Sequence, residues 1–81
     1  MTKRVKLDEN WVEVKTTADV LLTDGPFNLL ITTTAPTKFD PKEPGHLINH
    51  ALMLPQDTPA YVCNPRGGYV TGSVMDGSDA F

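Results

Sequence analysis

The chain has 81 residues, a single cysteine and a formal net charge of -3 at pH 7. The negative balance argues against a general nucleic-acid binder, which normally presents a basic surface. No apolar run is long enough to cross a membrane, and one cysteine excludes a disulfide within the chain. Because a chain this short buries only a thin core, we expect partner subunits to contribute to its stability.

The chain starts with a charged segment, residues 1–9, that lacks the apolar run of a secretory signal peptide. We expect these residues to form an N-terminal arm outside the folded domain. Lys3, Arg4 and Lys6 make the arm basic, so they are candidate contacts to an acidic neighbour. The alternative is a solvated, frayed terminus.

Six segments have the composition of β-strands, because Thr, Val and Leu recur in short runs that Gly and Pro interrupt. The expected strands are residues 11–14, 19–23, 27–34, 47–54, 60–64 and 68–75. Residues 47–54 also fit a short helix, since Leu47, Ala51 and Leu54 share a helical stripe. The short length and the flanking prolines suit a strand equally, and we favour a strand.

The longest break between these segments is the loop 35–45, which contains three prolines. Each proline removes a backbone donor, so we expect this segment to lie on the surface rather than in a central strand. The sequence therefore predicts an all-β protein, a small antiparallel β-sandwich or β-barrel of about six strands. The β domain is expected over residues 10–75 and a short acidic tail over residues 76–81.

Two turns carry strong sequence signals. Residues 23–26, Thr-Asp-Gly-Pro, combine tolerance of positive φ with a fixed φ, and we expect a hairpin between the flanking strands. Residues 64–67, Asn-Pro-Arg-Gly, have the preferences of a type I turn, and we expect a second hairpin there. In that hairpin Cys63 would lie opposite Tyr69.

The expected register of the second hairpin sorts its side chains onto two faces. The core-facing set is Ala60, Val62, Val70, Gly72 and Val74. The opposite set is Tyr61, Cys63, Tyr69, Thr71, Ser73 and Met75. Tyr61 and Tyr69 would then share one face, which suits either a contact surface or a half-buried sheet face.

Three motifs suggest chemistry, and each has a simpler explanation. Cys63 has no neighbouring base in the sequence to activate it, so a packing role is favoured. Residues 65–68 are Gly-rich but lead into a strand rather than a helix, which disfavours phosphate binding and leaves Arg66 as an exposed partner contact. His46 and His50 lack further ligands for a metal. We therefore predict no catalytic residue, cofactor or metal, and no enzyme activity.

The chain as a whole resembles the small β-domain virion proteins of tailed bacteriophages, over residues 10–75. The resemblance rests on Trp11, Ile31–Pro36, Gly45–Leu47 and Tyr61–Gly67. It implies a structural role and no catalytic residues. It also implies a location in the virion after synthesis in the host bacterial cytoplasm.

The leading expectation is a capsid decoration or stabilising protein that contacts other virion proteins and forms a small homo-oligomer, such as a trimer. The candidate interface residues are Lys3, Arg4, Lys6, Tyr61, Arg66 and Tyr69. One alternative is a tail, baseplate, neck or fibre component. A second alternative is a small non-virion module that binds single-stranded nucleic acid through tyrosines on a sheet.

Overall fold

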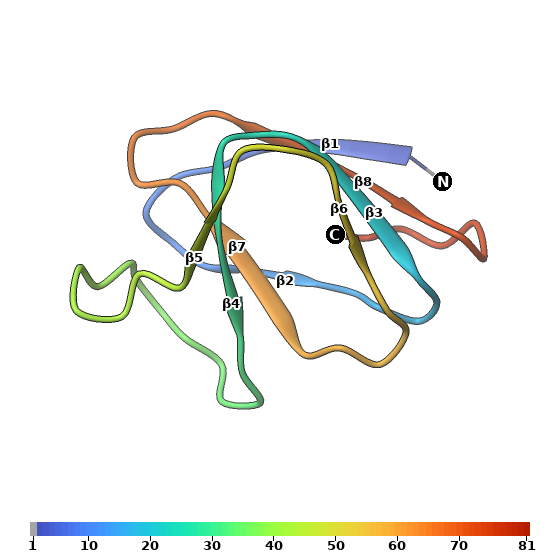
Figure 1. The fold of residues 1–81 in the computed structure, drawn as a ribbon, viewed down its shortest axis with the longest axis horizontal. Helices are drawn as coiled ribbons and strands as arrows, with labels where there is room; N and C mark the ends of the chain where they lie inside the picture. Colours follow the sequence, from blue (N-terminus) through green and yellow to red (C-terminus); the bar gives the residue numbers. More distant parts are fainter. Residues whose placement is uncertain (1) are drawn as a thin grey trace.

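In the computed structural model, which describes residues 2–81, the chain forms eight β-strands in two antiparallel sheets (Figure 1). The strands are β1 (Thr2–Lys6), β2 (Val12–Val14), β3 (Val20–Asp24), β4 (Phe27–Ile31), β5 (His46–Ile48), β6 (Leu52–Leu54), β7 (Ala60–Cys63) and β8 (Tyr69–Val74). The first sheet has the order β1-β8-β3-β6, and the second has the order β2-β7-β4-β5. The prediction of an all-β antiparallel fold is confirmed, and of the two expected architectures the structure has the sandwich, with eight strands rather than about six.

The two sheets are halves of one folded sheet. Matching each strand with its neighbour along the chain (β1 with β2, β8 with β7, β3 with β4, β6 with β5) converts one sheet order into the other. Four long antiparallel strands therefore each bend near the middle, and the two halves face one another across the core. Figure 1 shows the β3–β4 and β5–β6 connections running together over the top of the molecule.

Hydrogen bonds join the bends of neighbouring strands. The Leu7 N–H donates to the Gly68 carbonyl at 2.8 Å, and the Asn64 N–H donates to the Asp8 carbonyl at 3.0 Å. The Asn64 side chain also donates Nδ2–H to the Pro26 carbonyl at 2.9 Å. Asn64 thus connects three adjacent bends, where the regular ladders are interrupted and backbone groups need other partners.

Both predicted hairpins are wrong. β3 and β4 lie in different sheets, and so do β7 and β8. The turn at residues 64–67 does form, with the Gly67 N–H donating to the Asn64 carbonyl at 2.9 Å. Gly67 has a φ of 84° and Gly68 a φ of 125°. These two consecutive positive φ values, which glycine tolerates, direct β8 into the other sheet instead of back along β7.

The predicted pairing of β7 with β8 is also wrong, because it assumed the second hairpin. Cys63 pairs with Asn28 instead of Tyr69, and Val62 pairs with Val12 and Leu29. The predicted core-facing set is nevertheless buried throughout: Ala60, Val62, Val70, Gly72 and Val74. The alternation is correct because each strand turns every second residue toward the core, whichever sheet it belongs to.

The core lies between the two layers and is built from both. Its largest fully buried side chains are Phe27, Leu7, Leu22, Val20, Val62 and Val70. Residues 47–54 form no helix. They divide into β5 and β6, separated by the bend at residues 49–51, and the predicted strand over residues 27–34 ends at Ile31.

The two ends of the described chain belong to the folded unit, contrary to the expected arm and tail. Residues 2–6 form edge strand β1, paired with β8 along its whole length. At the other end Ala80 is buried, and its carbonyl accepts a hydrogen bond from the Lys15 N–H at 2.7 Å. Gly72 makes room for this tail, because a Cβ there would lie 2.5 Å from the Ala80 Cβ.

Candidate functional site

The six candidate interface residues do not gather on one surface. Lys6 lies opposite Tyr69 on the outer face of the first sheet, and Arg4 lies two residues away on the same face. Lys3 alternates to the other side of β1, where its Nζ donates to the Phe81 carbonyl at 3.4 Å.

The other two candidates lie elsewhere. Tyr61 is on β7 of the second sheet, opposite Glu13 and Leu30. Arg66 is exposed in the bend between β7 and β8. The expectation that Tyr61 and Tyr69 share a face is therefore wrong, and with it the single tyrosine platform on which the nucleic-acid alternative rested.

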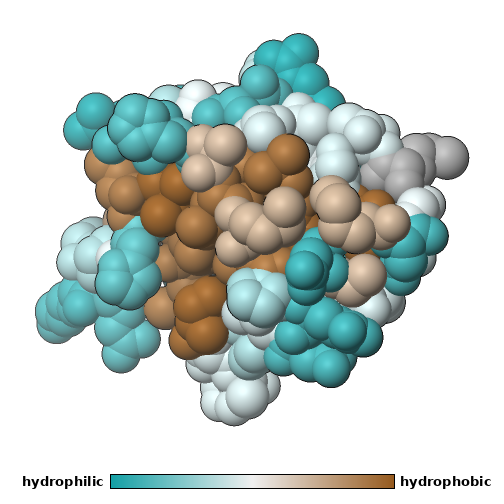
Figure 2. Space-filling view, turned by 45° about the vertical axis from the view of Figure 1, so that its right-hand side comes forward, coloured by the Kyte–Doolittle hydropathy of each residue, from teal (hydrophilic) through white to brown (hydrophobic). Residues whose placement is uncertain are grey.

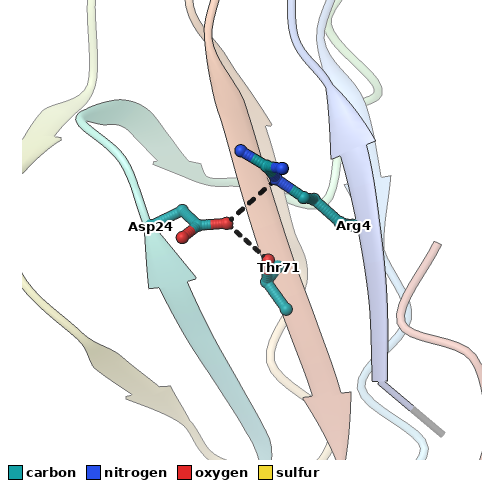
Figure 3. A network of polar contacts seen from close by, with 3 residues as sticks. All are labelled: Arg4, Asp24 and Thr71. Carbon is teal, nitrogen blue, oxygen red and sulfur yellow. Dashed lines mark hydrogen bonds and ion pairs between the residues drawn. The ribbon is translucent and has the colours of Figure 1, made fainter.

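A polar network occupies one end of the first sheet's outer face (Figure 3). Arg4 Nε lies 3.4 Å from Asp24 Oδ2, and the Thr71 hydroxyl donates to the same oxygen at 2.5 Å. The Arg4 guanidinium also lies 4.1 Å from the centre of the Tyr69 ring, within cation–π range. The network ties β1, β8 and β3 together on a solvent-exposed surface.

Large apolar side chains occupy the opposite end of the same outer face. Leu21 pairs with Met53 on one side and with Ser73 on the other, and Met75 follows two residues beyond Ser73. Met53 is 48% exposed and Met75 is 57% exposed. We call Leu21, Met53 and Met75 the methionine patch. Figure 2, on the face it presents, shows a broad apolar area bordered by hydrophilic side chains.

The outer face of the second sheet is partly covered by the proline-rich loop. The Trp11 N–H donates to the Thr37 carbonyl at 2.9 Å, and the Phe39 N–H donates to the Glu9 carbonyl at 2.7 Å. The Trp11 and Phe39 rings stack with their centroids 6.3 Å apart. The loop is on the surface, as predicted, but it is fastened to the bend between β1 and β2.

Cys63 lies within this covered region and is fully buried. Burial raises the pKa of its thiol to about 11, and the negative charge of Asp8 adds to the effect. The thiol is therefore protonated at neutral pH, which makes it a poor nucleophile. The geometry agrees with the packing role expected from the sequence.

A hollow of about 560 Å³ lies between the loop and the bend at residues 64–68. Its lining residues are Pro26, Asn28, Phe39, Leu47, Asn64, Pro65, Arg66, Gly67 and Gly68. We call it the Arg66 hollow. Leu47 is 61% exposed, the highest exposure among the large apolar side chains that the structure leaves open to solvent.

Within residues 2–81, no group of three His, Cys, Asp or Glu side chains is placed to hold a metal ion. His46 begins β5 and His50 lies in the following bend. The described residues also include no helix that is long and apolar enough to cross a membrane.

No protein-family profile, curated protein or solved structure matches this chain.

The sequence analysis placed Met75 on the outward face of its strand, and Met75 is exposed, but it missed Phe39, Leu47 and Met53. For Met53, alternation along residues 52–54 was a usable signal, because inward-facing Leu52 and Leu54 require Met53 to face outward. For Phe39 there was none, since its position depends on the pairing of the loop with residues 9–11.

Proposed function

We propose that this protein is a structural protein that acts through protein–protein contacts, and that the methionine patch is its principal contact surface. The observation that carries the proposal is the pairing of Leu21 with the exposed Met53 on the solvent face of one sheet, with the exposed Met75 in the turn directly after β8. Methionine is enriched at protein interfaces, and its flexible, polarizable side chain adapts to a partner's surface.

The charges around the patch suit a contact of this kind. Ser73 and Thr2 continue the same row of the sheet without a charge, and the charged network of Arg4 and Asp24 lies beyond them. An apolar centre with a polar border is the usual anatomy of a protein interface. Lys6 and Tyr69 lie at the far end of the same face, beyond Arg4 and Thr71, and are not part of the patch or its border.

The sequence resemblance supports a finer proposal, that the protein decorates or stabilises the capsid of a tailed bacteriophage as a small homo-oligomer. A small sandwich with an apolar patch at one end of an outer face is compatible with that role. A tail or baseplate position would use the same kind of contact.

The virion proposal is tested by mass spectrometry of purified particles from a phage whose genome encodes this chain. We expect the chain to copurify in a fixed ratio to the major capsid protein. Its absence from particles would end the virion proposal, and a map that places it on the tail would replace decoration by the tail alternative.

A further inference from the structure

We propose that the Arg66 hollow binds a peptide segment of another protein in which an apolar side chain stands next to an aspartate or glutamate. This site lies on the second sheet, away from the methionine patch, and the proposal does not depend on that patch.

The hollow is held in shape before any ligand arrives. Asn64 Oδ1 accepts a hydrogen bond from the Arg66 N–H at 3.0 Å, and Asn64 Nδ2–H donates to the Pro26 carbonyl at 2.9 Å. Asn28 Nδ2–H donates to the Pro44 carbonyl at 3.2 Å, which fastens the end of the loop. A preformed site loses less conformational entropy when it binds a ligand.

Four apolar side chains form part of the wall of the hollow, beside Asn28, Asn64 and Arg66. Phe39, Leu47, Pro26 and Pro65 line it. The volume of about 560 Å³ lies within the range of about 300–1,000 Å³ that is typical of ligand pockets. An aliphatic or aromatic side chain of a partner would bury the exposed Leu47 against Phe39.

Arg66 gives the site its charge preference. It is the one charged residue in the lining, and its guanidinium has no ion pair within residues 2–81. The ion pairs Arg4–Asp24 and Lys38–Glu9 lie outside the lining. A guanidinium matches the planar fork of a carboxylate, so an acidic residue next to the apolar one completes the match.

Amide NMR of the labelled protein tests this with capped tetrapeptides. The probe is acetyl-Gly-Leu-Asp-Gly-amide, and the comparisons are the same peptide with Asn in place of Asp, the same peptide with Ser in place of Leu, and inorganic phosphate. We expect the Asp peptide to shift the signals of Arg66, Gly67 and Leu47 and to bind about tenfold tighter than the Asn peptide. Trp11, the single tryptophan, provides a fluorescence readout through its stacking on Phe39.

The variants separate the two halves of the site. Arg66→Gln should abolish the preference for Asp over Asn, and Leu47→Ser should weaken both peptides. Arg4→Gln, which removes a cation from the opposite sheet, is the matched control and should change neither. Equal affinity for the Asp and Asn peptides, signal shifts outside the hollow, no binding at all, or the same response to phosphate alone would each overturn the proposal.

Discussion

The side-chain amide of Asn64 donates a hydrogen bond to the carbonyl of Pro26 at 2.9 Å, across the line where the sheet folds over. Asn64 lies in the bend between β7 and β8, and Pro26 lies in the bend between β3 and β4. The bond therefore joins two strands at the point where each one leaves the first sheet for the second. Folding a sheet in this way interrupts its ladders, and side chains such as Asn64 satisfy the backbone groups that lose partners.

Replacing Asn64 with alanine is expected to destabilise the fold by about 1–3 kcal/mol, because the Pro26 carbonyl and the Arg66 N–H lose their partners. Urea unfolding followed by circular dichroism measures the change. Asn49→Ala is the matched control, since Asn49 is exposed in the bend between β5 and β6. An equal effect of the two substitutions would show that Asn64 has no special role.

Replacing Gly72 with alanine is expected to displace the C-terminal residues. The added Cβ would lie 2.5 Å from the Ala80 Cβ and 2.8 Å from the Phe81 ring. We expect a loss of about 1–3 kcal/mol in the free energy of unfolding. Removing residues 80–81 from both backgrounds should make the substitution nearly neutral, and a cost that survives this truncation would place the strain elsewhere.

The Cys63 thiol is expected to react slowly with a soluble disulfide reagent at pH 8 and to make stability depend on alkaline pH. Its pKa is raised from 9.0 to about 11 in the folded protein, so the unfolded chain loses the proton first. The contribution of roughly 2–3 kcal/mol is fully present below pH 9 and is lost as the pH rises toward 11.

Cys63→Ala is the control for this titration, because it removes the thiol while keeping a small apolar side chain. Unfolding free energies of both proteins between neutral pH and pH 11 should converge as the pH rises. Parallel curves would contradict the assigned burial of the thiol.

The sequence predicts the strand composition and the inward faces because both depend on local alternation. It does not predict which strands share a sheet. The turn signals at residues 23–26 and 64–67 correctly locate changes of direction, but a turn residue does not specify whether the chain returns along its own ladder or crosses to another layer.

The chain ends were harder to predict for a different reason. β1 carries Lys3, Arg4 and Lys6, and such charges are common on edge strands. Without knowledge of the pairing partner, the same charges predict a solvated arm. The docking of Ala80 depends on the space above Gly72, which is a contact between residues distant in sequence. The exposed apolar surfaces depend on the same long-range arrangement.

The methionine patch on the first sheet is proposed to be covered by another protein chain. Analytical ultracentrifugation tests this most directly for the case in which that chain is a second copy of the same protein. We expect the wild-type protein to sediment as an oligomer that dissociates on dilution, and Met53→Lys to remain a folded monomer, because a lysine within the patch would have to lose its hydration on contact. Thr33→Lys, an exposed change in the loop after β4, should leave the oligomer intact. If Met53→Lys retained the oligomer, or if the wild-type protein were monomeric at every concentration, the patch would not be the contact between copies.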